Sequence, residues 1–428
     1  MQESSQEFAT EPVPEGHTVG WIRVALISAM VAFSLPTFVT GIEVSNAVDS
    51  RTALSAILCG NLLLSIIGAF CGAIGARTRL SSYMLTRVAF GTRGAALVNL
   101  AFAVSLLGWF GVNIDLFSGA VLRLLHDVLG IDAPGWVVEL GAGLVMTMTT
   151  VYGFRAINTL STILVPVLIA VTALLVVKAL GVRPIGETLI LASASELSFG
   201  HAMSSVVGGV IIGAIILPDI TRFIREWRGG IYTAVLSYLV IGSVVQGAGG
   251  LAAIAFGNDD LLDVMILIGL SWAAFAIVIA GSWVLNSLNL YSTVLSVEAT
   301  LPRLENRLLI AGLGALGTLA AFFDILDRFL SFLFYLAIVF APVAGVIAVD
   351  YLLLRRSAYH EERVSRQRLY VPHAIVAWFT GAIVALLGSE GIVTITGIAA
   401  IDAIGIAALA YFVLSRFDGR ADRHGIVG

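Results

Sequence analysis

The chain has 428 residues, of which 58% are hydrophobic and only 12% charged, and its mean hydropathy is +0.98. Soluble domains carry about a quarter charged residues, so this composition excludes a water-soluble globule and indicates an integral membrane protein. The formal net charge of −4 excludes little, because in a membrane protein the placement of the arginines matters more than their sum.

Long apolar runs recur along the chain, each near the roughly 20 residues with which a helix crosses a bilayer. We expect about twelve such helices. They are expected over residues 21–46, 52–76, 92–121, 134–153, 157–181, 198–221, 230–256, 261–297, 307–323, 329–354, 370–388 and 391–415. Residues 1–20 and 416–428 are expected to form cytoplasmic tails, the first of them disordered.

The arginines are unevenly divided between the two sides that these spans define. With the amino terminus inside, most of them fall on the inner side, including Arg222, Arg225 and Arg228 after the sixth span. Loops on the cytoplasmic side of membrane proteins carry an excess of Lys and Arg. We therefore expect both termini in the cytoplasm.

The first expected span carries a proline in its middle. Pro36 removes one backbone donor, and its ring crowds the carbonyl group four residues earlier. The residues around the freed backbone groups are Ser34, Thr37, Thr40 and Gly41. Non-helical backbone survives at membrane depth only when it is buried in protein or faces a wet cavity. We interpret this span as a broken helix beside a polar site; an ordinary proline kink is the alternative.

The sixth expected span repeats this feature. Its glycines at 208, 209 and 213 weaken a helix and let a ligand approach the backbone, and Pro218 follows near the inner end. The two spans are an odd number apart, which gives the two halves opposite polarity in the membrane. Paired interrupted helices in inverted repeats indicate a transporter binding site. The spacing of Gly209 and Gly213 also fits a plain helix contact face.

The third expected span places Ser105, Trp109 and Asn113 on one helix face, because they are four residues apart. An aromatic plane between two hydrogen-bonding side chains suits a flat heteroaromatic ligand. The eighth span carries a second polar stripe, formed by Ser282, Asn286, Asn289 and Thr293. We expect this stripe to face a cavity, although contacts between helices would also satisfy it.

Glu43 directly follows the break in the first span. Ionisable groups inside a helix bundle are functional candidates, so Glu43 is a candidate for proton coupling. The two cysteines and six histidines show no metal-binding spacing, and we expect no cofactor.

Five short runs of residues occur in an order found in a known family. They are Gly60–Leu64, Gly75–Thr78, Gly108–Gly111, Asp219–Phe223 and Ala341–Tyr351. Together they resemble the nucleobase:cation symporter family 1, and within it the bacterial cytosine permeases. The likeness covers the first ten spans in order.

The resemblance implies a leucine-transporter-type fold, with residues 21–181 and 198–354 as inverted repeats and residues 370–415 as two extra helices. It implies alternating access around a midplane site between spans one, three, six and eight, in a bacterial-type inner membrane. In this family the tryptophan of span three stacks on the nucleobase, which assigns that role to Trp109, and the aromatic residue near the span-one break would be Phe33.

The chain departs from the cytosine permeases at several positions. Alignment through Asp219–Phe223 places Val210 and Ile212 where those permeases have an aromatic residue and a serine, and Gly281 where they have an asparagine. Cytosine itself is therefore in question. The expected substrate-binding residues are Phe33, Ser105, Trp109, Asn113, Gly209, Val210, Gly213, Gly281 and Asn286.

The coupling ion, Na⁺ or H⁺, depends on span eight. Sodium-coupled relatives present two hydroxyl groups there, and alignment on Leu290 and Tyr291 places Val284 and Leu285 at those positions. Sodium is a hard cation that needs oxygen ligands. Either Ser282 and Ser287 take over after a small shift, or the chain uses protons, with Glu43 as the candidate, or no ion. We expect weak or absent sodium dependence.

The sequence thus predicts a secondary active transporter that imports a nucleobase such as cytosine. Alternatives are a permease for another ring, such as a purine, a hydantoin, allantoin or a thiamine precursor, or an amino-acid or amine carrier on the same fold. An enzyme would need a metal or nucleophile constellation, which the scattered histidines do not supply. The expected partners are the small-molecule substrate and the lipid bilayer, with no nucleic acid; the oligomeric state is left open.

Overall fold

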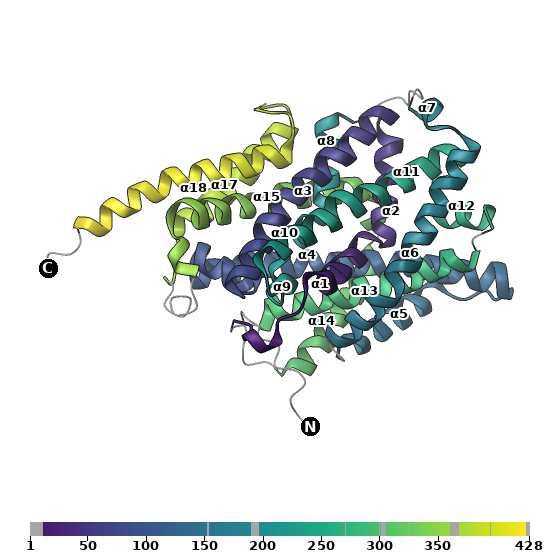
Figure 1. Cartoon of the computed structure of the whole chain (residues 1–428), viewed down its shortest axis with the longest axis horizontal. Coiled ribbons are helices and arrows are strands. Elements are labelled where there is room, and N and C mark those ends of the chain that lie inside the picture. Colours follow the sequence, from purple (N-terminus) through teal and green to yellow (C-terminus); the bar gives the residue numbers. More distant parts are fainter. Residues whose placement is uncertain are drawn as a thin grey trace.

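The chain is helical throughout the part that the computed structural model describes. The described residues are 12–151, 154–189, 197–269, 271–298, 300, 305–323, 325–359, 368–393 and 395–424. Within these ranges the only extended pairing is an isolated bridge between Val19 and Ile224. The all-α class expected from the sequence is confirmed (Figure 1).

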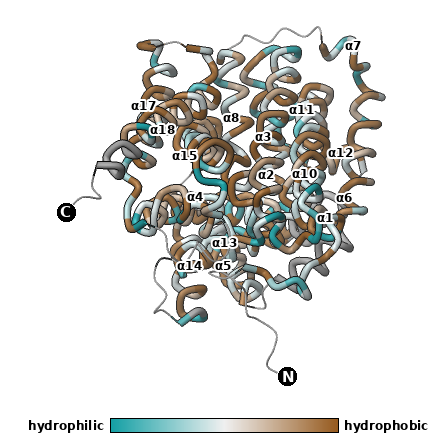
Figure 2. Tube along the Cα trace, turned by 60° about the vertical axis from the view of Figure 1, so that its left-hand side comes forward, coloured by the Kyte–Doolittle hydropathy of each residue, from teal (hydrophilic) through white to brown (hydrophobic). Residues whose placement is uncertain are grey.

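Eight helices within the described ranges are long and apolar enough to cross a membrane. A ninth span is formed by α1 (Trp21–Ala32) and α2 (Leu35–Ala47), which meet at a bend of 50°. Hydrophobic residues predominate along most of the helices (Figure 2). On α3 (Ser50–Thr78) the exposed side chains Leu54, Leu58, Leu62 and Ile66 follow one another at helical spacing. Such a stripe suits contact with lipid tails. The total of about twelve spans stays a prediction.

A first helix group contains both broken spans. It consists of α1, α2, α3, α8 (Phe199–Ile215), α9 (Pro218–Thr221), α10 (Trp227–Ala234), the π-helix η2 (Val235–Gly242) and α11 (Ser243–Phe256). In this group α3 packs on α8 and α10, and α2 packs on α11. The approach of α2 to α11 is so close that a Cβ atom on Gly41 would overlap the carbonyl oxygen of Gln246.

A second helix group faces the first. It consists of α4 (Ser82–Leu129), α5 (Gly135–Val151), α13 (Ser271–Glu298) and α14 (Asn306–Ala320), which all contact one another. Helix α6 (Phe154–Val182) contacts both groups, through α1 and α11 on one side and α13 on the other. The short helices α7 (Ile185–Thr188) and α12 (Leu261–Leu267) lie against α11.

The remaining long helices pack together beside the first group. They are α15 (Phe329–Val349), continued by the π-turn η5 (Asp350–Leu354), then α17 (Pro372–Ser389) and α18 (Ala399–His424). Helix α15 packs on α8, and α17 and α18 pack on each other and on α15 (Figure 1). The short 3₁₀ turns are η1 (Glu15–His17), η3 (Ala321–Phe323), η4 (Ile325–Arg328) and η6 (Arg356–Tyr359).

Several elements differ from the boundaries expected from the sequence. Helix α18 begins at Ala399 rather than at 391 and continues to His424, so most of the expected tail 416–428 is helical. Helix α4 begins before residue 92 and bends at Gly91, whose φ of +76° is the left-handed conformation that glycine favours. The expected span 261–297 is divided into α12 and α13 after Gly269, with φ +81°. Residues 12–20 do not form a free tail, because Val13 is buried and the backbone N–H of Val19 donates to the carbonyl oxygen of Phe223 at 2.7 Å. Residues 1–11 lie outside the described residues.

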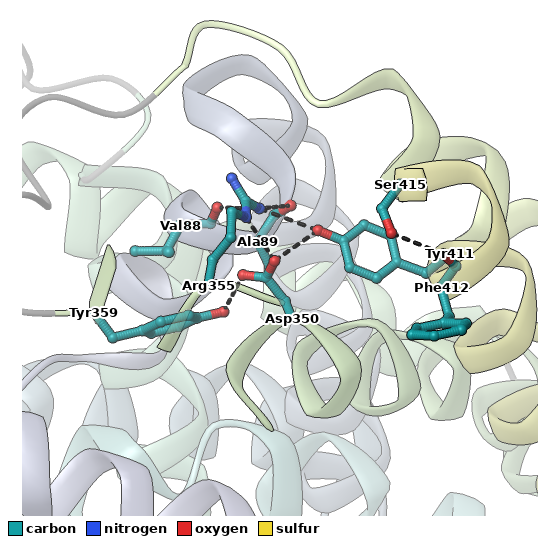
Figure 3. A network of polar contacts seen from close by, with 8 residues as sticks. All are labelled: Val88, Ala89, Asp350, Arg355, Tyr359, Tyr411, Phe412 and Ser415. Carbon is teal, nitrogen blue, oxygen red and sulfur yellow. Dashed lines mark hydrogen bonds and ion pairs between the residues drawn. The ribbon is translucent and has the colours of Figure 1, made fainter. Parts of the chain in front are cut away.

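A buried polar network joins α15, α4 and α18 (Figure 3). The carboxylate of Asp350, which is fully buried, accepts hydrogen bonds of 2.7 Å each from Arg355 Nε, the Tyr359 hydroxyl and the Tyr411 hydroxyl. Arg355 Nη2 also donates to the carbonyl oxygen of Val88 at 3.0 Å. Burial, and next the charge of Asp350, raise the pKa of Tyr359 well above its ordinary value, so its hydroxyl stays a donor at neutral pH.

Candidate functional site

A cavity lies between the two helix groups, beside the break between α1 and α2. Its empty volume is about 870 Å³, including space continuous with solvent. The lining residues come from α1, α2, α8, α9, η2 and α11 of the first group and from α4 and α13 of the second. The break expected in the first span therefore does border a cavity.

The backbone at the break is satisfied by the hydroxyl groups that surround it. The Ser34 hydroxyl donates to the carbonyl oxygen of Val31 at 2.8 Å and lies 3.1 Å from the Thr37 hydroxyl. The Thr40 hydroxyl donates to the carbonyl oxygen of Pro36 at 2.8 Å. All five residues line the cavity. The hydroxyls thus replace the helix hydrogen bonds that Pro36 interrupts.

Trp109 and Leu106 form the wall that α4 contributes. Trp109 is 8% exposed, and two rings of α15 meet its ring edge to face, Phe329 at a centroid distance of 6.1 Å and Phe332 at 5.4 Å. Packing of this kind holds an aromatic side chain in one orientation. Trp109 therefore presents a fixed aromatic surface to the cavity.

Helix α8 contributes a face with little side-chain volume. Gly209, Val210 and Gly213 line the cavity, as does Ile212. The helix is continuous through these glycines and is interrupted later, at Ile216, before α9 begins at Pro218. The second discontinuity expected from the sequence is thus present, but it lies nearer the end of the span than the glycine cluster.

Helix α13 turns a different face to the cavity than the expected stripe. The lining residues are Leu285, Leu288, Asn289 and Ser292. Of the stripe, Asn289 alone belongs to the described lining; Asn286 Nδ2 donates to the carbonyl oxygen of Phe110 at 3.0 Å and lies 3.2 Å from Met146 Sδ, so it joins α13 to α4 and α5.

The segment from η2 to α11 supplies two lining residues that the sequence analysis did not single out, Tyr238 and Gln246. Gln246 is 1% exposed, and its Oε1 accepts a hydrogen bond of 2.6 Å from Asn61 Nδ2 of α3. The signal that the sequence offered for Tyr238 and Gln246 was a polar side chain within an apolar span. Neither residue belongs to a polar stripe, so the spacing did not single them out.

Of the nine expected substrate-binding residues, Trp109, Gly209, Val210 and Gly213 line the cavity. The other five are not part of the described lining: Phe33, Ser105, Asn113, Gly281 and Asn286. Phe33 and Gly281 do lie close together, because a Cβ atom on Gly281 would be 3.4 Å from the carbonyl oxygen of Phe33. The buried Asn113 donates from Nδ2 to the carbonyl oxygen of Trp109 at 2.8 Å, within its own helix. Ser105 is partly exposed.

The residues considered for ion coupling do not converge on one point of the described lining. Glu43 is partly exposed on α2, and the hydroxyl oxygens of Ser282 and Ser287 are buried with no hydrogen-bond partner in the described part of the chain. Val284 belongs to an apolar cluster with Met30 and Phe33 of the first span. The described residues contain no group of three or more His, Cys, Asp or Glu side chains that could hold a metal ion.

Comparisons with known proteins agree with this architecture. Residues 12–414 match a family described as permeases for cytosine/purines, uracil, thiamine and allantoin. A cytosine permease of Escherichia coli K12 is 29% identical over 409 residues, which cover 95% of this chain and 94% of the permease. A hydantoin permease of Microbacterium maritypicum is 24% identical over 391 residues, which cover 85% of this chain and 78% of that permease.

The fold is shared with a solved transporter structure. It is Mhp1, a nucleobase-cation-symport-1 family transporter in a closed conformation with bromovinylhydantoin bound. The TM-score is 0.82 at 19% sequence identity, with 96% of each chain covered. This likeness confirms the leucine-transporter-type fold expected from the sequence.

Proposed function

Because the chain belongs to the family of permeases for cytosine/purines, uracil, thiamine and allantoin, we propose that it imports cytosine or a closely related flat heterocycle across the inner membrane. Membership of this permease family confirms the expectation that the chain is a transporter and not an enzyme. The substrate within this class, the coupling ion, the orientation and the residues of the site are the parts that we propose.

One observation carries the proposal: an aromatic surface and two amide side chains line the same cavity. Trp109 offers a face on which a ring can stack, while Gln246 and Asn289 offer donors and acceptors to its edge. Flat heterocycles are recognised by this combination of stacking and edge contacts. Trp109 and Asn289 belong to the second helix group and Gln246 to the first, so a bound ring would touch both groups.

The charges of the described lining disfavour an amino-acid or amine carrier. No Lys, Arg or His belongs to it, so nothing there pairs with a substrate carboxylate. Its one carboxylate is Asp219, whose Oδ1 accepts hydrogen bonds of 2.8 Å from both the backbone N–H and the hydroxyl of Ser82. That carboxylate is engaged at the start of α4 and is poorly placed to hold an ammonium group. A neutral ring is the substrate that this cavity fits best.

The ring is cytosine or a relative of similar size. The cytosine permease of Escherichia coli K12 supports cytosine through its similarity over nearly the whole chain, whereas the hydantoin permease supports a different ring. Val210 and Ile212 line the cavity, and by alignment they replace an aromatic residue and a serine of the cytosine permeases. Aliphatic side chains there leave Trp109 as the main stacking surface and fit a less selective pocket, so purines, hydantoins, allantoin and thiamine precursors are the next candidates.

Sodium is expected to have little influence on transport. Where α13 meets the end of α1, Val284 and Phe33 pack in one apolar cluster, and aliphatic side chains offer no oxygen to a hard cation. The unpartnered hydroxyls of Ser282 and Ser287 are the remaining oxygen donors on that helix. Coupling to protons through Glu43, or no coupling, agrees better with these contacts.

The test is uptake of labelled cytosine into proteoliposomes at fixed pH and membrane potential, with and without an inward sodium gradient. We expect uptake above protein-free liposomes and less than about a twofold effect of sodium. Strong sodium dependence that is lost in Ser287→Ala would contradict the proposed coupling. Absence of cytosine uptake, with uptake of a purine or hydantoin in the same vesicles, would reassign the substrate.

A further inference from the structure

Gln246 is held in one orientation by a neighbour whose own orientation is fixed. Asn61 Nδ2 donates to the carbonyl oxygen of Ile57 at 2.9 Å and to Gln246 Oε1 at 2.6 Å. A backbone carbonyl can only accept a hydrogen bond, so the NH₂ group of Asn61 must lie on this side. The atom of Gln246 that meets it must then be the oxygen. This argument assigns the amide orientation from its partners.

Both residues of the pair are buried where helices pack closely. The side-chain oxygen of Asn61 faces Gly242, where an added Cβ atom would lie 2.8 Å from it. The backbone of Gln246 is pressed against α2 at Gly41. Asn61 and Gln246 are each 1% exposed. The pair is therefore fixed at the crossing of α2, α3 and α11.

The NH₂ group of Gln246 remains for the cavity. Gln246 lines the cavity, and within the described residues no hydrogen bond from its Nε2 is found. That nitrogen is also not among the fully buried polar atoms that lack a partner. A side-chain amide nitrogen carries two hydrogens and accepts nothing. Towards the cavity, Gln246 therefore offers only N–H donors, which suit a hydrogen-bond acceptor on a bound molecule.

We propose that Gln246 is a specificity-determining residue that donates a hydrogen bond to a carbonyl oxygen of the transported ring. This inference rests on the proposed function and makes it narrower. A site that hydrogen-bonds one group of its substrate rejects an analogue without that group strongly, because its own polar atoms are then left unpaired. Keto heterocycles such as cytosine, uracil and hypoxanthine present the required oxygen, and adenine does not.

The test uses Gln246→Glu. The carboxylate has nearly the same shape, and one of its oxygens can still accept from Asn61, so the helix contact is retained. The other oxygen would face the cavity as an acceptor in place of the donor. Binding of cytosine, uracil, hypoxanthine and adenine is measured by calorimetry on the full-length protein in nanodiscs, for the wild type and for the variant.

The matched control is Asn99→Asp, which makes the same amide-to-carboxylate change at another buried side chain. Asn99 donates to the Thr86 hydroxyl at 3.1 Å and does not belong to the described lining of the cavity. We expect Gln246→Glu to weaken binding of the keto rings at least about tenfold relative to binding of adenine. Asn99→Asp should leave the ratio of these affinities unchanged. A ratio of affinities does not move when a variant merely loses part of its folded fraction.

Three further results are decisive. If the wild type binds the rings and Gln246→Glu has the same ratio of affinities for keto rings and adenine, the role of Gln246 is overturned and the proposed function stands. Both are overturned if the wild type binds none of the four rings and also binds no hydantoin, allantoin or thiamine precursor. If Gln246→Glu does not fold, Asn61→Asp replaces it, since that change removes the donor that orients Gln246; an unaltered ratio there overturns the role as well.

Discussion

Trp109 combines two properties that bear on ligand binding. Its ring is packed edge to face against Phe329 and Phe332, and yet it borders open space. Supporting contacts of this kind mean that little conformational entropy is lost when a ligand stacks on the exposed surface. Trp109 belongs to the buried core, and its side that borders the cavity is suited to bind a ring.

Trp109→Ala should weaken binding of a heterocyclic substrate by roughly five- to a hundredfold, since stacking of a base on an aromatic side chain is worth roughly 1–3 kcal/mol and about 1.4 kcal/mol is a factor of ten. The measurement is the KM of uptake into proteoliposomes. Trp136→Ala is the control, because Trp136 is 58% exposed on α5 and away from the cavity. An unchanged KM in Trp109→Ala would remove the stacking role.

Sequence spacing could identify Trp109 but not its true neighbours. Ser105 and Asn113 share its helix face by spacing, but the residue of α4 that lines the cavity with Trp109 is Leu106. A period of 3.6 residues says which residues lie together and leaves open which neighbour they face. Gln246 was not predicted because its role depends on Asn61, which lies on a different helix.

At the scale of elements, the broken helices were predictable and the rotation of the helices was not. Pro36 and Pro218 mark both interruptions in the sequence. On α13, however, the cavity meets Leu285 and Asn289, whereas Asn286 lies against α4. Apolar residues line much of this cavity, so polarity alone could not identify the inward face. The bend at Gly91 was also missed, because a lone glycine in a helix carries no sign of its φ.

The polar network at the end of α15 should contribute strongly to stability. Asp350→Asn removes the charge that Arg355 faces at 2.7 Å, and breaking a buried ion pair costs roughly 3 kcal/mol or more. We expect a melting temperature lower by several degrees in detergent. Asp263→Asn is the control, because the pair of Asp263 with Arg123 is exposed and surface pairs contribute little. Equal melting temperatures of the two variants would contradict a structural role of the network.

For the whole molecule, the cavity lies at the boundary between two helix groups, so tilting one group against the other changes access to it. Its lining continues from the break at Ser34 towards Ser28 of α1 and Ile220 of α9. Seen from Ser34, Ser28 lies in the direction of the first residue of α1, and α9, which carries Ile220, packs against α1. In the proposed orientation, this end of the cavity faces the cytoplasm.

Ser28→Cys should therefore react with a water-soluble maleimide from the cytoplasmic side only, and saturating substrate should slow the reaction severalfold. The background needs Cys59→Ser and Cys71→Ala, since Cys59 is exposed. Ser65→Cys is the control, because Ser65 is buried but does not belong to the described lining. Labelling of Ser28→Cys from the outside alone would reverse the proposed orientation.

The short bridge near the amino terminus has a practical consequence. Val19 donates to the carbonyl oxygen of Phe223 at 2.7 Å, and its own carbonyl accepts from the N–H of Arg225 at 3.1 Å. The entry to the first broken helix is thereby tied to the exit from the second, so the two ends shift together. A purification tag or fluorescent fusion inserted just before residue 19 would disturb these two hydrogen bonds, so a fusion for assays and imaging is better attached after α18.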